Sequence, residues 1–268
     1  MTHGPITSAS NPRIRSALEL RERRHRERRG LTLVDGAREV LRAIAARADV
    51  EEAFVCDPLV RTPEADAARQ AIRRAGVPEV VVGERAFERL AFGERAEGII
   101  AVVRPPSTSL ADLSLPVEPL IVVVEAVEKP GNLGAILRSA DGAGADALIA
   151  ADPRTDLFNP NAIRASLGTI FSMPVAAGTA ADVLDWLVDR AIRPAAARVD
   201  AGKPYTETDL RGPIALVLGS EAEGLTTTWD DRRVLPVHLP MLGVADSLNV
   251  AAAAAILLYE ARRQRGIG

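Results

Sequence analysis

Two spacings of apolar residues alternate along the N-terminal part of the chain. Short runs of strand length, rich in valine and isoleucine, occur at residues 31–36, 50–57, 77–83 and 98–103. Between them, residues 37–48 and 65–76 place apolar side chains three and four positions apart, which is the spacing of an amphipathic helix. This pattern predicts an α/β module.

A stretch rich in proline and serine separates this module from a second one. We therefore predict a first domain at residues 1–104, a linker at 105–118 and a second domain at 119–268. The second domain opens with the unbroken apolar run LIVVVEAVE (120–128), which is typical of a parallel strand buried on both faces. Strands at 145–152 and 214–220 alternate with helices, and a helix ends the chain, so we expect a parallel sheet.

Composition narrows the class of protein. With 47% apolar residues over 268 positions, the chain can build domains with real cores, and its single cysteine, Cys56, cannot form an internal disulfide. The longest apolar stretch, Val250 to Tyr259, is too short to span a bilayer, and the N-terminus lacks a secretory apolar segment. We expect a cytoplasmic protein without a membrane span. His3, His25 and His238 are scattered, so no metal site is expected.

Charge is distributed unevenly along the chain. The formal net charge is −3, yet eight arginines and only three glutamates lie between Arg13 and Arg29. Such a run is either a solvated helix face with paired charges or an arm that contacts phosphates. The candidate RNA-contacting residues in it are Arg13, Arg15, Arg21, Arg23, Arg24 and Arg26.

The first candidate motif follows the strand at 120–128. In EKPGNLGAILRSADG we expect Asn132 to cap a helix of about nine residues that ends before Gly142. Arg138 lies inside that helix, and its long side chain leans toward the helix N-terminus. By itself this segment fits two interpretations, a turn and cap with a salt-bridged arginine, or a ligand site on an open glycine loop.

Two further motifs occur near the C-terminus. In IALVLGSEAEGLT a buried strand ends at Gly219 and is followed by Ser220, Glu221 and Glu223, where carboxylates could meet a ligand. In HLPMLGVADSLNV a glycine loop precedes the final helix, which we expect Asp246 or Ser247 to cap. Alone, these segments also fit an acidic turn and an ordinary amphipathic helix.

Common nucleotide-binding motifs are missing. A P-loop needs lysine followed by serine or threonine after its glycines, and the sequence has no such segment. The GxG fragment at 142–144 precedes a strand, whereas a dinucleotide fingerprint joins a strand to the following helix. The sequence therefore does not indicate either class of nucleotide site.

Together, in this order and spacing, the three motifs resemble those of the SpoU (TrmH-like) family of RNA 2′-O-ribose methyltransferases, in the SPOUT superfamily. The resemblance covers Leu120 to about Arg262, and residues 8–40 and 92–103 more loosely resemble the RNA-binding domain that often precedes it. It implies that the catalytic residues are Asn132, Arg138, Glu221, Ser247 and Asn249. It implies that the cofactor-binding residues are Ala197, Gly219, Leu239 and Leu248. Two departures, VDG for the commoner VEG and GSE for GNE, concern the substrate class.

The resemblance also implies a fold and a reaction. The fold would be α/β, with a trefoil-knotted parallel-sheet methyltransferase domain at the C-terminus behind a smaller α/β RNA-binding domain. S-adenosylmethionine would bind in the knot, and two chains would pair as a homodimer through this domain. The ribose 2′-oxygen would attack the methyl group directly, without a metal. Arg138 would either activate the hydroxyl or stabilise the developing negative charge.

Two other functions share much of this pattern. A non-catalytic RNA-binding protein could keep the knot as a dimerisation scaffold, although all five motif residues are present. A base methyltransferase uses a related knot but lacks the asparagine and arginine pair of the first motif. We expect ribosomal RNA of the 23S type as substrate rather than transfer RNA, because the N-terminal module resembles those of ribosomal RNA enzymes.

Overall fold

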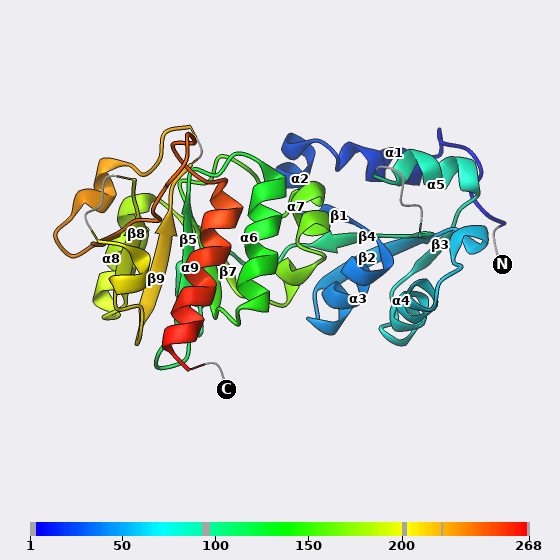
Figure 1. The fold of residues 1–268 in the computed structure, drawn as a ribbon. Coiled ribbons are helices and arrows are strands. Elements are labelled where there is room, and N and C mark those ends of the chain that lie inside the picture. The colour runs from blue at the N-terminus through cyan, green and yellow to red at the C-terminus, as the bar shows by residue number, and fades with distance from the viewer. Residues whose placement is uncertain (1–3, 93–96, 200–202, 221, 267–268) are drawn as a thin grey trace. The chain divides into compact units, whose positions relative to one another are not determined.

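The structure is a computed structural model that describes residues 4–92, 97–199, 203–220 and 222–266. The chain divides into two units (Figure 1). The N-terminal unit comprises Met1–Pro106 and Phe158–Ser172, and the C-terminal unit comprises Ser107–Leu157 and Met173–Gly268. Each unit has its own sheet, so we describe them separately.

A mixed sheet in the order β1-β4-β2-β3 forms the centre of the N-terminal unit. Its strands are β1 (Thr32–Asp35), β2 (Asp49–Val55), β3 (Glu79–Val81) and β4 (Ile99–Arg104). Strand β4 pairs antiparallel with β1 and β2, while β2 and β3 are parallel. The helices of this unit are α1 (Pro12–Glu19), α2 (Arg23–Arg29), α3 (Ala37–Ala45), α4 (Pro63–Arg74) and α5 (Glu84–Leu90), with a 3-10 turn at Asp57–Leu59.

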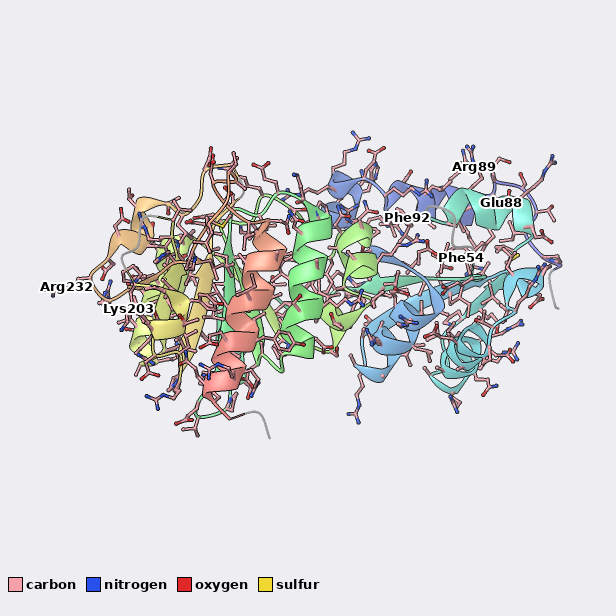
Figure 2. All side chains as sticks on the ribbon, in the orientation of Figure 1. Phe54, Glu88, Arg89, Phe92, Lys203 and Arg232 are labelled. Atoms are coloured by element: carbon pink, nitrogen blue, oxygen red, sulfur yellow. The ribbon has the colours of Figure 1, made fainter. Side chains whose placement is uncertain are left out.

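The core of this unit forms because alternate strand residues point to the same face of the sheet. Phe54 and Ile100 on one face pack with Ile14 of α1 and Phe87 of α5 in one buried cluster. The polar side chain of Arg89 on α5 points away from the sheet, whereas Phe54 is fully buried beneath the helices (Figure 2). The sequence pattern predicts every strand of this sheet but not α5, whose seven residues are too few to show a helical period.

A segment from the middle of the sequence completes the N-terminal unit. It contains α7 (Pro160–Ala165) and a 3-10 turn at Thr169–Phe171. The Oγ1 of Thr32 donates to the carbonyl of Phe158 at 2.7 Å, and Arg42 donates to the carbonyl of Leu167 at 2.7 Å. The chain therefore enters this unit twice.

The C-terminal unit has a six-stranded sheet in which every pairing is parallel, as predicted, in the order β10-β8-β9-β5-β6-β7. The strands are β5 (Leu120–Glu125), β6 (Ala147–Ala151), β7 (Val175–Gly178), β8 (Arg193–Ala197), β9 (Ile214–Leu218) and β10 (Leu235–Val237). Central strand β5 is buried at every residue, which accounts for its unbroken apolar run. Residues of the expected linker continue along edge strand β7, where Ala177 N–H donates to the carbonyl of Thr108 at 2.8 Å.

Helices cover both faces of this sheet. Helix α8 (Ala180–Asp189) packs with residues such as Ile121, Val123 and Val217 in one buried cluster. Alternation along the strands turns Val122 and Leu216 to the other face. On that face α6 (Pro130–Gly142) and α9 (Val250–Gln264) lie side by side, and α9 also contacts β9 (Figure 1). The remaining 3-10 turns are Leu110–Asp112, Tyr205–Glu207 and Thr227–Asp230.

Both ends of helix α6 differ from the sequence prediction. Helix α6 begins at Pro130, with Lys129 as N-cap, so Asn132 lies inside the first turn. The ring of Pro130 fixes φ near the helical value, so the helix begins there and not after Asn132, the predicted N-cap. The helix ends later as well, because Gly144, with φ of +66°, is the left-handed residue that terminates it, and Gly142 is not.

The final helix is capped by Asn249. Its side chain accepts a hydrogen bond from Ala251 N–H at 3.0 Å, so the prediction of Asp246 or Ser247 as cap was wrong. Asparagine is as good an N-cap as aspartate or serine, so sequence preference could not choose among three candidates within four positions. Among the described residues, no helix is both long and apolar enough to cross a membrane.

Candidate active site

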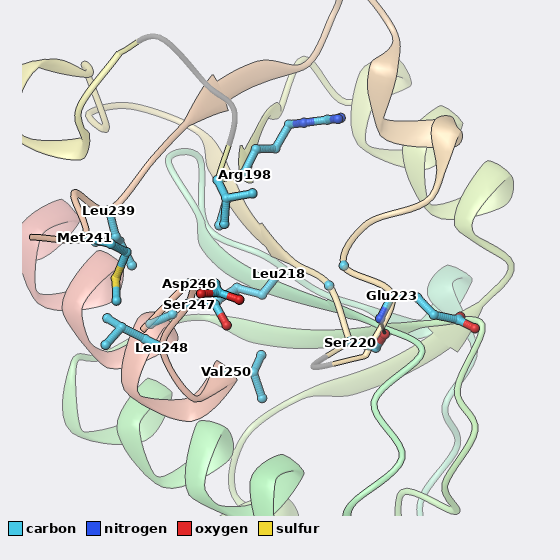
Figure 3. A pocket seen from close by; sticks show the side chains of 15 residues that line it. Arg198, Leu218, Ser220, Glu223, Leu239, Met241, Asp246, Ser247, Leu248 and Val250 are labelled. Carbon is cyan, nitrogen blue, oxygen red and sulfur yellow. Dashed lines mark hydrogen bonds between the residues drawn. The ribbon is translucent and has the colours of Figure 1, made fainter. Parts of the chain in front are cut away.

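A pocket of about 380 Å³ lies at the carboxyl ends of three neighbouring strands of the C-terminal unit. Its lining includes Ala197 of β8, Leu218 of β9, Gly219 directly after β9, and Leu239 of the segment after β10. Figure 3 shows Leu218 and Leu239. The carboxyl ends of parallel strands are where ligands bind in open α/β sheets. Strand order thus brings together residues that lie far apart in the sequence.

The walls of the pocket combine apolar side chains with bare backbone. Leu218, Leu248 and Val250 supply apolar surface, and Gly219 and Gly224 expose peptide groups. Polar side chains are few, namely Arg198, Ser220, Glu223, Asp246 and Ser247 (Figure 3). This composition suits a flat heteroaromatic group whose polar edge is read by backbone N–H and C=O groups.

Gly219 cannot carry a side chain in this fold. A Cβ there would lie 2.2 Å from the carbonyl carbon of Gly224 and 2.5 Å from the nitrogen of Leu225. The chain makes this close approach because Ser220 and Gly224 exchange two backbone hydrogen bonds, each 3.1 Å long. Gly224, with φ of +68°, provides the left-handed turn that closes the loop.

The structure relates the implied site residues to this pocket in different ways. All four implied cofactor-binding residues, and Ser247 of the implied catalytic set, line it. Asn132 and Asn249 do not line it but meet each other, because the Asn249 amide donates to Asn132 Oδ1 at 3.4 Å. This contact joins the first motif to the third. Glu221 lies outside the described residues.

Arg138 is exposed on α6 and is not among the pocket-lining residues. It makes no hydrogen bond or ion pair with any residue that the structure describes. Its guanidinium is therefore available to a group that approaches from solvent, outside the space enclosed by the strand ends.

An ion-pair network lies beside the pocket. Arg154 donates to Glu128, in the loop before α6, and to the pocket-lining Glu223, each at 2.7 Å. These two hydrogen bonds raise the pKa of Arg154 above its ordinary value. All three side chains are exposed, so the network contributes little to stability, but it links the loops of the first two motifs.

The arginines of the N-terminal run divide into two groups. Arg26 is only 5% exposed and donates to the carbonyls of Leu20 and Arg21, so it holds the turn between α1 and α2. Arg21 donates to the carbonyls of Leu90 and Ala91 and stacks on Phe92 at 4.7 Å.

Four further members of the run, Arg13, Arg15, Arg23 and Arg24, are exposed, whereas Arg29 is partly buried and donates to the carbonyl of Ser16 at 2.7 Å. Arg13 pairs with Glu52, Arg23 with Glu27 and Arg24 with Glu22. Arg15 is exposed and has no hydrogen bond or ion pair within the described part of the chain. Sequence spacing could not separate the buried from the exposed arginines, because both kinds occur within one short, charged segment.

Comparisons with known proteins agree with this geometry. The model of the SpoU rRNA Methylase family matches residues 119–259, and that of the MRM3-like substrate binding domain matches residues 11–101. The chain belongs to the SpoU rRNA methylase family. In this SpoU chain, one family model spans the strands that form the pocket, and the other spans the α1 and α2 arginines.

Curated relatives and solved structures extend the match to nearly the full length. The chain is 30% identical to the 23S rRNA (guanosine(2553)-2'-O)-methyltransferase RlmP of Bacillus subtilis (strain 168), over 96% of this chain and 98% of that protein. A crystal structure of an RNA 2'-O ribose methyltransferase is 39% identical, with a TM-score of 0.86 over 97% of this chain and 99% of that one. The SpoU methyltransferase AviRb of Streptomyces viridochromogenes, in complex with AdoMet, is 29% identical, with a TM-score of 0.86 over 95% and 98%.

Sequence reasoning about this SpoU chain missed several pocket residues. Arg198, Met241 and Asp246 line the pocket but belong to none of the residue sets that the resemblance implied. Arg198 directly follows the end of β8, so position at a strand terminus was a usable signal. Met241 and Asp246 lie in a loop without regular structure, where no periodicity could assign them to a site.

Proposed function

We propose that this chain transfers a methyl group from S-adenosylmethionine to a ribose 2′-oxygen in ribosomal RNA of the 23S type. The observation that carries the proposal is the pocket, which gathers Gly219 of the second motif and Ser247 and Leu248 of the third at the ends of parallel strands. Membership of the SpoU family and the full-length similarity to a 23S rRNA 2'-O-methyltransferase support the reaction and the substrate class.

The pocket suits S-adenosylmethionine. Its volume of about 380 Å³ and its backbone-lined strand ends fit an adenosine group. The carboxylates of Glu223 and Asp246, which also line it, suit a cation. Bound S-adenosylmethionine supplies an electrophilic methyl group, and the residues Ala197, Gly219, Leu239 and Leu248 would hold its adenosine part.

Arg138 acts on the RNA side of the reaction. A guanidinium loses its proton with difficulty, so it is a poor general base. Its exposed position on α6 lets it hold an RNA phosphate and stabilise negative charge that develops on the 2′-oxygen. Asn132 and Asn249, which bond to each other, orient the ribose together with Ser247. Glu221 steadies Arg138 or the motif loops.

The C-terminal unit forms a trefoil knot. Strand β10 lies at the sheet edge beyond β8, whereas the helix that follows it, α9, packs against β9 and α6. The chain must therefore return across the strand ends before it terminates, and this return supports a knotted path. Two chains pair through this unit as a homodimer, with Ile256 and Tyr259 of α9 as exposed apolar contacts.

The N-terminal unit binds the RNA, and the protein acts in the cytoplasm. Residues 1–104 form the RNA-binding domain, 105–118 the linker and 119–268 the methyltransferase domain. Within the last range, Phe158–Ser172 is part of the N-terminal unit. Arg13, Arg15, Arg23 and Arg24 contact phosphates from the surface. Arg21 and Arg26 act mainly by fixing the shape of that surface, because their guanidinium groups donate to backbone carbonyls.

An assay on unmodified RNA tests the function directly. Purified protein is titrated with S-adenosylmethionine by calorimetry, and methyl transfer to ribosomal RNA from cells lacking the gene is followed by mapping 2′-O-methyl nucleotides. We expect binding and methylation by the wild type. We expect Arg138→Ala to lower turnover by on the order of a hundredfold or more, with cofactor affinity within a few fold.

Three outcomes would contradict parts of this proposal. Failure of the wild type to bind S-adenosylmethionine would favour a scaffold protein. Methylation on a base would favour the other knotted class. Full turnover by Arg138→Ala would remove that residue from the reaction and leave the family assignment intact.

A further inference from the structure

Glu125 is a buried carboxyl residue that belongs to neither the implied catalytic residues nor the implied cofactor-binding residues. It ends the central strand β5, and its side chain is completely enclosed, with 0% exposure. A carboxylate without solvent is costly unless its oxygens accept hydrogen bonds, so its partners reveal what holds it there.

Both oxygens of Glu125 bind the same residue. Oε2 accepts from the backbone N–H of Thr226 at 2.8 Å, and Oε1 accepts from the Thr226 hydroxyl at 2.7 Å. Removing either donor would leave a buried carboxyl oxygen without a partner, which costs more than an ordinary hydrogen bond contributes. The pair is therefore a strong link between the end of β5 and a residue about a hundred positions later.

Thr226 closes the loop that forms one wall of the pocket. The loop leaves the sheet at Gly219, turns through the Ser220 and Gly224 backbone pair, and returns to Thr226. Val124 lies beside Leu218 in the register of β5 and β9, so Glu125 and Gly219 are neighbours at the carboxyl ends of these two strands. Both ends of the loop are thus fixed at the carboxyl end of the sheet.

Glu125 also directly precedes the loop that leads into α6. That loop contains Ala126, with φ of +50°, and ends at Lys129, the N-cap of α6, whose first turn contains Asn132. One side chain therefore joins the segment that carries Asn132 to the segment that lines the pocket with Ser220 and Glu223. Its hydrogen bonds act between the two motif loops.

We infer that Glu125 is a positioning residue, which through Thr226 holds the pocket-wall residues Gly219, Ser220 and Gly224 in the geometry that receives S-adenosylmethionine. The inference rests on the proposed function, because it concerns the ligand of that site. Arg154 links the same two loops from outside through exposed ion pairs with Glu128 and Glu223. Because exposed pairs are screened by salt, the buried link carries most of the effect at physiological ionic strength.

Substitutions at Thr226 test this role without removing the buried carboxylate. Thr226→Val keeps the shape and the backbone N–H but deletes the hydroxyl donor, whereas Thr226→Ser keeps the donor. We expect Thr226→Val to raise the Kd for S-adenosylmethionine about fivefold to tenfold, measured by calorimetry, and Thr226→Ser to stay within about twofold of wild type. Turnover at saturating cofactor should change less than the Kd.

A matched control separates positioning from loss of stability. Thr32 in the N-terminal unit is fully buried, and its hydroxyl also donates a hydrogen bond, 2.7 Å long. Thr32→Val should therefore lower the melting temperature much as Thr226→Val does, while leaving the cofactor Kd within about twofold of wild type.

Two results would overturn the inference. One is a Thr226→Val protein that binds the cofactor as wild type does while melting at a lower temperature. The other is equal weakening of cofactor binding by Thr32→Val. In either case the wild type still binds S-adenosylmethionine, so the proposed function would stand. A wild type that does not bind it would instead reject the proposed function.

Discussion

Asp35 ends strand β1 of the N-terminal unit and Glu125 ends strand β5 of the C-terminal unit, and both side chains are buried. Glu125 has both oxygens bound to Thr226. Asp35 uses only Oδ2, which accepts from Phe92 N–H at 2.7 Å and from Arg164 at 3.2 Å, while Oδ1 has no partner among the described residues. The same position at a strand end is therefore fully satisfied in one unit and partly satisfied in the other.

This difference has an electrostatic consequence. Burial raises the pKa of Asp35 to about 6, and the nearby carboxylates Glu39 and Glu97 add to the rise, against the lowering effects of the Phe92 N–H and Arg164. Burial raises the pKa of Glu39 as well. Burial thus makes Asp35 sensitive to pH near 6. Glu125, with both oxygens bound to Thr226, fixes a loop. We expect the closely packed pocket wall to tolerate less change than the N-terminal unit, in which Asp35 titrates.

The largest effect is expected where the pocket is most closely packed. Gly219→Ala places a methyl group against the backbone of Gly224, which must shift and take the pocket wall with it. We expect a loss of about 2–4 kcal/mol in the free energy of unfolding and a rise in the S-adenosylmethionine Kd on the order of a hundredfold. Urea unfolding and calorimetry measure the two quantities. Gly243→Ala is the control, because a Cβ there meets nothing within 4 Å; an equal effect from both would contradict the packing argument.

An intermediate effect is expected at Asp35. Because its folded pKa is above the value of 3.8 in the unfolded chain, the proton on Asp35 stabilises the fold below about pH 4, and this contribution is lost as pH rises through about 6. Relative to wild type, Asp35→Asn should gain about 2 kcal/mol of unfolding free energy between about pH 4.5 and about pH 7.5. Denaturant unfolding at both values measures it, and a difference that does not change with pH would show that Asp35 keeps an ordinary pKa.

The smallest effect is expected at the exposed arginines. The double variant Arg15→Gln, Arg24→Gln should lower RNA affinity about threefold to tenfold and reduce the slope of affinity against salt by about 1–2. Arg73→Gln on α4, where the arginine pairs with Glu79, is the matched control. Filter binding at several salt concentrations provides the measurement. If Arg73→Gln weakens binding equally, the effect is one of total charge and not of this surface.

Sequence patterns predicted the elements more accurately than their ends. Strand-length apolar runs identified β1 to β6 and β9, because a buried strand needs β-branched side chains in its own sequence. The caps of α6 and α9 were misassigned, since several adjacent residues could fill each role and local sequence does not rank them. The three motifs were recognised because their order and spacing together resemble those of the SpoU family, whereas each one alone also fitted an ordinary turn, cap or helix.

By itself, the sequence determined the α/β class and the parallel sheet, because apolar spacing expresses local requirements. The motif residues were predicted from their resemblance to the SpoU family. Only the tertiary structure decided that β9 lies between β5 and β8, so that Ala197, Gly219 and Leu239 meet at one pocket. It also decided that Phe158–Ser172 belongs to the N-terminal unit and that Arg26 is enclosed. These outcomes depend on pairings between distant segments, and the free energy of such contacts is not encoded in any single stretch of the chain.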